Sequence, residues 1–402
     1  MSSNTVLTTD LVTKEGARIL TNSLSYSKIM NRDFESKFKG PVDTGTSIRI
    51  PKPAQWPVRK ASNTFSSKPM IETYSTLEIG APDGIDTTIT QAEMDMSLDN
   101  FSGRVLNTQM PRLASSVDGT LINLGAKYAK SYQSAASTSL AYTDVAYLRA
   151  RLVEQCLPKG EQLHMFCNPI DQVQLLGDTK GLFQNSNEIA GQYVDGMMGK
   201  FGGFNWVETN MLETVTPPAD VAGTVNQPTA VVNGASTLDV DAFGATDVVP
   251  ASAIVTIAGC YAINPETKAT LPHLKPFRLD SATTMVSNAG TFTFTEPMYD
   301  NTDSRQNVSA LPADGAVVTI IGTASTAYQQ NLGTHKDAFT IAFVDMDVPN
   351  GTDLASKMTH EGVTLRFVRE WDFEANTWKS RFDVQYGGID FRPEWSGILS
   401  NF

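Results

Sequence analysis

The stretch that decides the fold is the longest helical signal in the chain, residues 94–124, MDMSLDNFSGRVLNTQMPRLASSVDGTLINL. Its apolar side chains recur at steps of three and four residues, the period of one helix face. Pro111 lies inside this pattern, and because proline lacks an N–H we expect it to kink or divide the helix. A helix of this length among many short strand signals predicts an α+β protein.

Helical spacing also appears on both sides of this segment. Leu11, Ala17, Leu20 and Leu24 form a stripe that Asp10 can cap, although the apolar content of residues 1–45 is too small for a core of its own. We therefore expect residues 1–45 to be an N-terminal arm that lies on other parts of the protein. A further helix is predicted from a Thr143 cap to Cys156, and a short strand over 162–166.

Residues 46–80 read as an extended β-hairpin. Ser47–Ile50 and Tyr74–Ile79 alternate, and the prolines between them confine such strands to an edge or an exposed ribbon. The hairpin is mildly basic, whereas the whole chain has a net charge of −12. A protruding ribbon of opposite charge favours contact with a neighbouring copy. We expect that contact to involve the following residues: Arg49, Trp56, Arg59 and Lys60.

The composition changes near residue 217. Residues 221–334 are rich in Thr, Val, Ala and Gly, show no convincing helix, and contain short alternating runs between turn signals. This pattern predicts an inserted all-β, barrel-like domain over 221–334, with linkers at Thr216–Pro218 and Tyr328–Asn331. Alternating strands return over 335–402, so we expect them to complete the domain that begins with residues 81–220.

A search of the sequence for chemistry gives no catalytic, cofactor-binding or metal-binding residues. There is no G-x-S-x-G or G-x-x-x-x-G-K-[ST] motif, and the glycine-rich run 191–203 reads as a surface loop. Cys156, His164 and Cys167 lack zinc spacing, so buried thiols are favoured, with Cys156 on the stripe of its helix. Asp345 and Asp347 read as solvated carboxylates at a strand end. We therefore expect no enzyme.

The bulk properties exclude further classes. No lysine- or arginine-rich block occurs, which disfavours a dedicated DNA-binding domain. No apolar run is long enough to span a membrane, and the first residues do not resemble a secretory signal. These features predict a protein made in a cytoplasm.

The order of the predicted parts resembles the major coat proteins of tailed bacteriophages, with the HK-ninety-seven-like fold. It is most similar to the short-tailed-phage branch that carries an inserted domain. Four passages strengthen the likeness: Gly80–Asp83 after the hairpin, Phe166–Pro169, the Gly-rich turn Gly199–Phe204 with Val207–Asn210, and the closing strands from Asp337 to Glu394.

The resemblance implies a fold and a function that composition could not give. The parts would be arm (1–45), extended loop (46–80), spine helix with peripheral and axial subdomains (81–220 and 335–402), and inserted domain (221–334). Copies would form the pentamers and hexamers of an icosahedral shell, first as a precursor built with a scaffolding protein, which expands on packaging. The partners implied are other copies, scaffolding protein, portal protein and double-stranded DNA bound without sequence specificity, in a virion assembled in the host cytoplasm.

Two other classes stay open at this point. A tail-tube or decoration protein would also be β-rich and self-assembling, but the long stripe over 94–124 disfavours it. A β-rich binding module or enzyme would need a convergent polar site, which the sequence does not show.

Overall fold

The computed structural model describes residues 9–38, 47–53, 71–89, 102–135, 139–158, 160, 163–179, 199–349, 351, 354–374 and 377–402. The chain divides into two compact units, which are described separately. Unit 1 is Met1–Ile50, Ser75–Ile122 and Phe339–Ile389, and unit 2 is Pro51–Tyr74, Asn123–Ala338 and Asp390–Phe402. The five-segment division drawn from the sequence stays a prediction.

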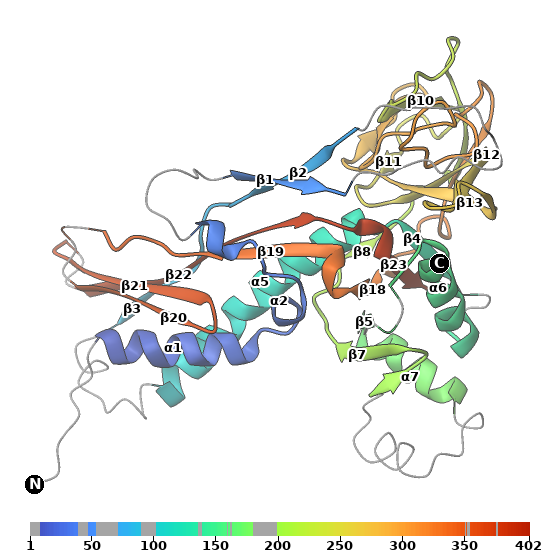
Figure 1. Ribbon diagram of the computed structural model, residues 1–402. Coiled ribbons are helices and arrows are strands. Elements are labelled where there is room, and N and C mark those ends of the chain that lie inside the picture. The colour runs from blue at the N-terminus through green and yellow to red at the C-terminus, as the bar shows by residue number, and fades with distance from the viewer. Residues whose placement is uncertain are drawn as a thin grey trace, which may run out of the picture. The chain divides into compact units, whose positions relative to one another are not determined.

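Unit 1 packs helices on one sheet (Figure 1). Its helical elements are α1 (Thr9–Ser23), α2 (Tyr26–Ile29), η1 (Glu35–Phe38), a π-helical turn (Ser102–Leu106) and the long helix α5 (Asn107–Tyr128), which extends into unit 2. Ala17 and Leu20 are buried on α1, as the spacing predicts, and Leu24 is buried just after the helix, whereas Leu11 is only partly buried. Gly16 has no side chain where a Cβ would meet Leu365 at 3.0 Å, so α1 lies close against the sheet.

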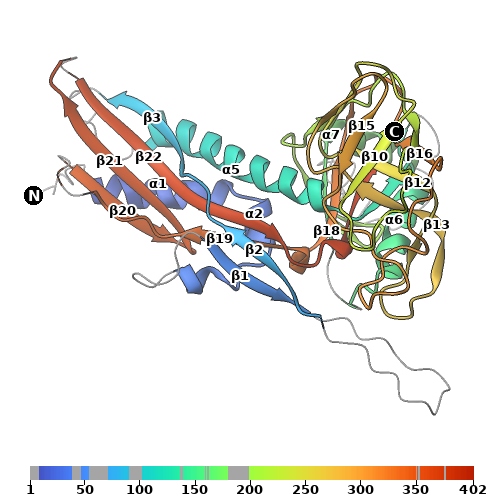
Figure 2. The same cartoon turned by 90° about the horizontal axis from the view of Figure 1, so that it is seen from above.

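The sheet of unit 1 has five strands. They are β3 (Asp83–Ile89), β19 (Phe339–Val344), β20 (Leu354–His360), β21 (Val363–Asp372) and β22 (Thr377–Asp390). The order is β19-β22-β21-β20, and β3 also pairs with β22. Figure 2 shows the long β21–β22 hairpin beside α1 and α5. Separately, β1 (Ser47–Lys52) and β2 (Thr73–Glu78) pair with each other as a two-stranded sheet.

The body of unit 2 is a six-stranded sheet with two helices. In sheet order the strands are β4 (Ser131–Ser134), β23 (Ser396–Ser400), β18 (Asn331–His335), β5 (Leu163–Cys167), β7 (Phe204–Glu208) and β6 (Lys200–Phe201). The helices are α6 (Tyr142–Glu154) and α7 (Pro169–Thr179), and two short 3-10 helices are η3 (Lys336–Ala338) and η4 (Pro393–Trp395). Leu148, Leu152 and Met165 are among the residues that form the core between helices and sheet.

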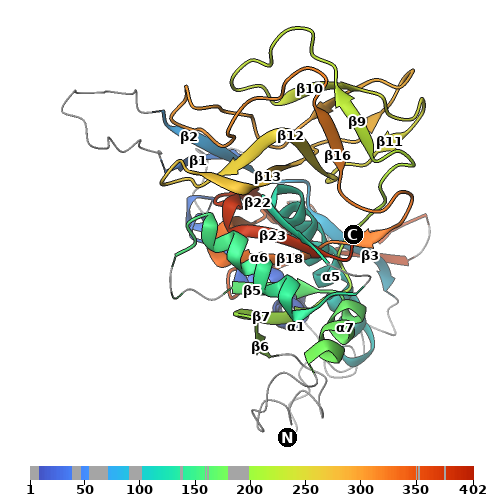
Figure 3. The same cartoon turned by 90° about the vertical axis from the view of Figure 1, so that its right-hand side faces the viewer.

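Between residues 221 and 321, unit 2 forms a barrel made of strands alone, which we call the β module (Figure 3). Its strands are β9 (Ala222–Val225), β10 (Thr237–Asp241), β11 (Val248–Val249), β12 (Ile254–Ile263), β13 (Thr270–Arg278), β14 (Thr283–Thr284), β15 (Gly290–Thr293) and β16 (Val317–Ile320). Six of them run in the order β13-β12-β16-β9-β10-β15. Its two edges meet, because the Asp280 N–H donates to Thr293 O at 2.8 Å and the Thr295 N–H donates to Arg278 O at 2.9 Å.

Three local expectations differ from the structure. Helix α5 continues through Pro111, so of the expected kink or division, the division is wrong. The π-helical turn ends just before Asn107, whose carbonyl is the one that Pro111 leaves without its i+4 N–H. Helix α6 begins before Thr143, because Asp144 accepts the Ala141 N–H at 3.0 Å. The predicted linker at 328–331 is instead β17 (Tyr328–Gln329), which pairs with β8 (Thr214–Val215), so entry to and exit from the module run side by side.

Candidate functional site

The residues predicted to contact a neighbouring copy belong to the hairpin 46–80. Arg49 lies on β1, where exposed and buried side chains alternate, and its own side chain is on the exposed face. Trp56, Arg59 and Lys60 lie outside the described residues. The structure therefore presents Arg49 at the surface of its strand, and the other three residues remain a prediction from sequence.

The cysteines and the paired aspartates form no reactive cluster where they are described. Cys156 is a free, partly exposed thiol whose Sγ lies 3.6 Å from Asn264 Oδ1. The expectation that it lies on the helix is wrong, since α6 ends at Glu154 and Cys156 has a φ of 61°. Asp345 follows β19 and pairs with Lys357 at 2.9 Å. Among the described residues, no three His, Cys, Asp or Glu side chains converge as a metal site requires.

A buried ion triad joins the β module to the segment that follows α5. Glu296, on the module, is 8% exposed, and its Oε1 lies 2.8 Å from Lys275 Nζ on β13. Its other oxygen, Oε2, contacts Nζ of Lys130, two residues beyond the end of α5. Two ammonium groups therefore share one carboxylate, and both of its oxygens are used.

Arg278 and Lys127 add two further links to the end of α5. The Arg278 guanidinium is buried, and its Nη2 donates both to the carbonyl of Ala126 and, at 2.6 Å, to Gln330 Oε1. Ala126 lies in the last turn of α5, where carbonyls have no i+4 partner within the helix and the helix dipole favours a cation; its carbonyl also accepts the Ala129 N–H at 3.3 Å. Lys127 Nζ lies 2.8 Å from Asp280, at a more exposed position. We call these two links and the triad the module joint.

Burial and charge act in opposite directions on the groups of the module joint. Burial alone would raise the pKa of Glu296, but Lys130 and Lys275 outweigh it and lower that pKa to about 2. The pKa of Lys130 is raised although burial opposes its charge, because Glu296 attracts it. Burial lowers the pKa of Arg278 to about 10. Glu296 and Lys130 therefore stay ionised across the physiological range.

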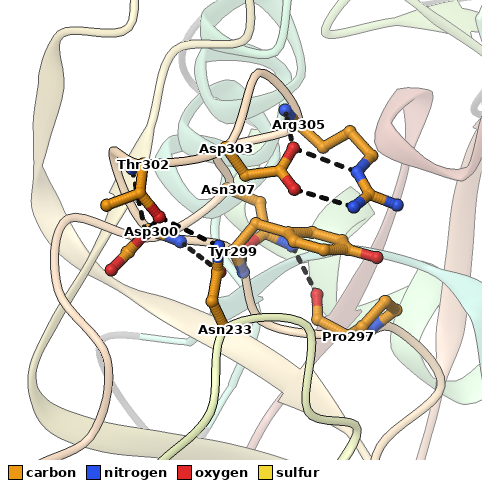
Figure 4. Close-up of polar contacts among 8 residues, drawn as sticks. All are labelled: Asn233, Pro297, Tyr299, Asp300, Thr302, Asp303, Arg305 and Asn307. Atoms are coloured by element: carbon orange, nitrogen blue, oxygen red, sulfur yellow. Dashed lines mark hydrogen bonds and ion pairs between the residues drawn. The ribbon is translucent and has the colours of Figure 1, made fainter. Parts of the chain in front are cut away.

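A surface loop of the β module is braced by its own polar side chains. Figure 4 draws the residues concerned: Asn233, Pro297, Tyr299, Asp300, Thr302, Asp303, Arg305 and Asn307. Arg305 donates to both oxygens of Asp303, at 3.0 and 2.7 Å, and its guanidinium lies 4.0 Å from the centre of the Tyr299 ring. The Asn307 side chain accepts the Tyr299 N–H and donates to Pro297 O, both at 2.8 Å. These bonds fix the shape of the loop and engage the Asp303 carboxylate.

In unit 1, one buried carboxylate holds the arm on α5. Asp118 is 4% exposed, and its Oδ2 accepts the N–H groups of Ser25 and Tyr26 at 2.6 and 3.1 Å. Its Oδ1 accepts the Ser27 N–H at 3.2 Å and also the Ser27 hydroxyl. The carboxylate thus satisfies the free N–H groups at the start of α2. It adds directional bonds to the apolar contacts that the arm makes.

Comparison with known proteins shows which family the chain belongs to. A family model described as P22 coat protein, gene protein 5, matches residues 41–399. This chain belongs to the P22 coat protein family. It is a major capsid protein that forms the shell of a phage, and the likeness to tailed-phage coat proteins seen in the sequence is confirmed. No curated protein matches this coat protein.

Solved structures similar to this coat protein are distant in sequence. One is from Mycobacterium phage Che8, with 12% identity, a TM-score of 0.49, and coverage of 94% of this chain and 90% of that chain. Another is the capsid of Cyanophage P-SCSP1u, with 11% identity, a TM-score of 0.42, and coverage of 89% and 84%. The CUS-3 coat protein I-domain has 19% identity and a TM-score of 0.20, and covers 26% of this chain and 96% of that one. Among the described residues of this chain, no helix is both long and apolar enough to cross a bilayer.

Sequence reasoning missed the module joint of this coat protein. Lys130 and Glu296 are far apart in the chain, and neither belongs to a recognisable motif. One signal was available. Lys275 and Phe277 are two residues apart on one strand, so their side chains point to the same face, and Phe277 is buried. A charge on an inward-facing position implies a buried partner, although the sequence does not identify it.

Proposed function

We propose that this coat protein builds an icosahedral shell of pentamers and hexamers through a precursor assembled on a scaffolding protein. The precursor expands as DNA enters through a portal protein. The observation that carries the proposal is the family match over residues 41–399. It leaves the tail-tube, decoration and binding-module alternatives without support, because each would require a different family.

We also infer that the shell encloses double-stranded DNA without binding it tightly. We infer as well that the protein catalyses no reaction. The net charge of −12 repels phosphates, so packaged DNA is free to leave the shell. The carboxylates and ammonium groups of the module joint are engaged with one another, which suits a structural role. Assembly in the host cytoplasm and residence in the virion follow from the same proposal.

The first test is assembly itself. The full chain is expressed alone and with the scaffolding protein of its own virus, and the soluble high-mass fraction is imaged by negative-stain electron microscopy. Closed shells, tubes or spiral fragments support the proposal. A chain that stays monomeric under both conditions contradicts it.

A second test concerns the hairpin. We propose that Arg59 and Lys60, with Arg49 and Trp56 nearby in sequence, meet carboxylates of a neighbouring copy. Reversing both charges (R59E with K60E) should abolish shells while the thermal unfolding of the monomer stays unchanged. The matched control exchanges the two side chains (R59K with K60R), which keeps the charge and should keep assembly. Normal shells from the reversed variant would refute this contact.

A further inference from the structure

On one face of the β21–β22 hairpin, large side chains continue beyond the part that the described residues of unit 1 bury. Side chains two residues apart on a strand share a face, so Phe367, Arg369 and Trp371 lie on one side of β21, and Phe373 follows them at the end of the strand. Their exposed fractions rise steadily, from 0% at Phe367 through 9% and 37% to 91% at Phe373. The buried face of the sheet therefore continues into an exposed aromatic end.

This end is ordered by its own contacts. Trp371 and Trp378 lie directly opposite each other on the two strands, with ring centres 4.8 Å apart in an edge-to-face arrangement. The Arg369 guanidinium lies 4.2 Å from the centre of the Trp378 ring. We call Trp371, Phe373 and Trp378 the aromatic tip.

The other face of the hairpin end is polar. Glu370 is exposed, and Asp372 forms an ion pair with Lys379 across the strands. Water can therefore solvate one face of the hairpin end, whereas the other presents large rings. Single exposed apolar residues are ordinary, but a preformed group of aromatic rings beside an arginine has the composition of an interface hot spot.

We propose that the aromatic tip is a contact between copies of this chain, in which Phe373 enters an apolar surface of a neighbouring subunit. The proposal rests on the proposed function, because a shell surrounds each subunit with other copies of the same chain. Trp371 and Trp378 already pack against each other in the monomer, so these two rings lose little conformational freedom when a neighbour covers them. The ring of Phe373 is almost fully accessible in the monomer, so nearly its whole area is available for burial by a neighbour.

The test replaces Phe373 with serine. Phe373→Ser should leave monomer unfolding unchanged, since the ring is 91% exposed, yet raise the protein concentration needed for half-maximal shell formation roughly tenfold or more. Phe373→Leu, which keeps an apolar side chain, should restore most of the assembly. Val232→Ser is the matched control, because Val232 is 74% exposed on the β module and lies outside the aromatic tip.

The outcomes separate this inference from the proposed function. Shell formation by F373S at the wild-type concentration overturns the contact but leaves the coat-protein function intact. Equal losses in F373S and V232S also overturn it, since the effect would then belong to any exposed apolar side chain. A wild-type chain that never associates, alone or with its scaffolding protein, overturns both. Loss in F373S with rescue in F373L supports the contact.

Discussion

The sharpest prediction concerns the ion triad of the module joint. Replacing Glu296 by glutamine keeps the shape of the side chain but removes its charge, so Lys130 and Lys275 lose their shared counter-ion. At the 2.8 Å that separates Lys275 Nζ from the carboxylate, one pair attracts by about 6 kcal/mol in a medium of effective dielectric constant about 20. Desolvation offsets much of this, and removing one member of a buried pair typically costs about 3–5 kcal/mol.

The lowered pKa of Glu296 gives a second value for the contribution of this residue to the free energy of unfolding. A carboxyl group whose pKa falls from 4.5 to about 2 on folding contributes about 3 kcal/mol. Because the pKa of the folded state is the lower one, this contribution is fully present above about pH 4.5 and is lost as the pH falls toward 2. The two values agree, so we expect E296Q to lower the free energy of unfolding of unit 2 by about 3 kcal/mol at pH 7.

Calorimetry of the purified monomer measures this loss. For a unit of this size, about 3 kcal/mol corresponds to a decrease of roughly 6–12 °C in the midpoint of the unit 2 transition. Asp280→Asn is the matched control, because the partly exposed pair with Lys127 contributes at most about 1 kcal/mol. The stability difference between wild type and E296Q should also shrink below pH 4.5. An E296Q midpoint no lower than that of D280N would refute the reasoning.

Three further predictions test the other buried groups. Asp118→Asn should speed amide hydrogen exchange at residues 25–27 about 30-fold, which corresponds to about 2 kcal/mol; unchanged exchange would show that the carboxylate does not hold the arm. At pH 8, a thiol reagent should modify Cys156 in the native protein but spare Cys260, whose pKa burial raises to about 11; early labelling of Cys260, located by mass spectrometry, would contradict this. Arg278→Lys should cost about 1–3 kcal/mol in urea unfolding, because the shorter lysine side chain falls short of Ala126 O and Gln330 Oε1, which Arg278 Nη2 reaches; full stability would mean that these two bonds contribute little.

Much of the fold could be predicted because local pattern and tertiary environment agree there. Ala17 and Leu20 of the predicted stripe are buried on α1, where helical spacing places them, although Leu11 is only partly buried. Part of β21 and part of β22 alternate between buried and more exposed side chains, as a strand with one buried face does, whereas β19 and β23 are buried almost throughout. The β module was visible because residues 221–334 are poor in helix formers and rich in β-branched residues and turn signals. In each case, neighbouring residues in the sequence carry the information.

The errors occurred where a distant partner or a competing cap decides the structure. Thr143 is a good cap residue, but Asp144 bonds the Ala141 N–H and begins α6 earlier. Tyr328 and Gln329 carry no strong strand pattern and form β17 only because Thr214 and Val215 pair with them. Only tertiary structure can bring Lys130 to Glu296. Neither propensity nor spacing contains that information.

The arm and the β module are each bonded to the rest of their unit through one buried carboxylate. This mode of attachment has a consequence for a protein that assembles. Asp118 and Glu296 each concentrate several hydrogen bonds or ion pairs on one buried carboxylate, whereas apolar packing would spread the same energy over a wide area. Directional bonds fix an orientation, because a shift of an ångström breaks them, whereas an apolar contact tolerates sliding. A shell needs its subunits to present contact surfaces in reproducible orientations. We therefore expect substitutions at Glu296 that keep the monomer folded to yield shells of irregular curvature, measurable as a broadened diameter distribution in electron micrographs. Uniform shells from such variants would show that the joint serves stability alone.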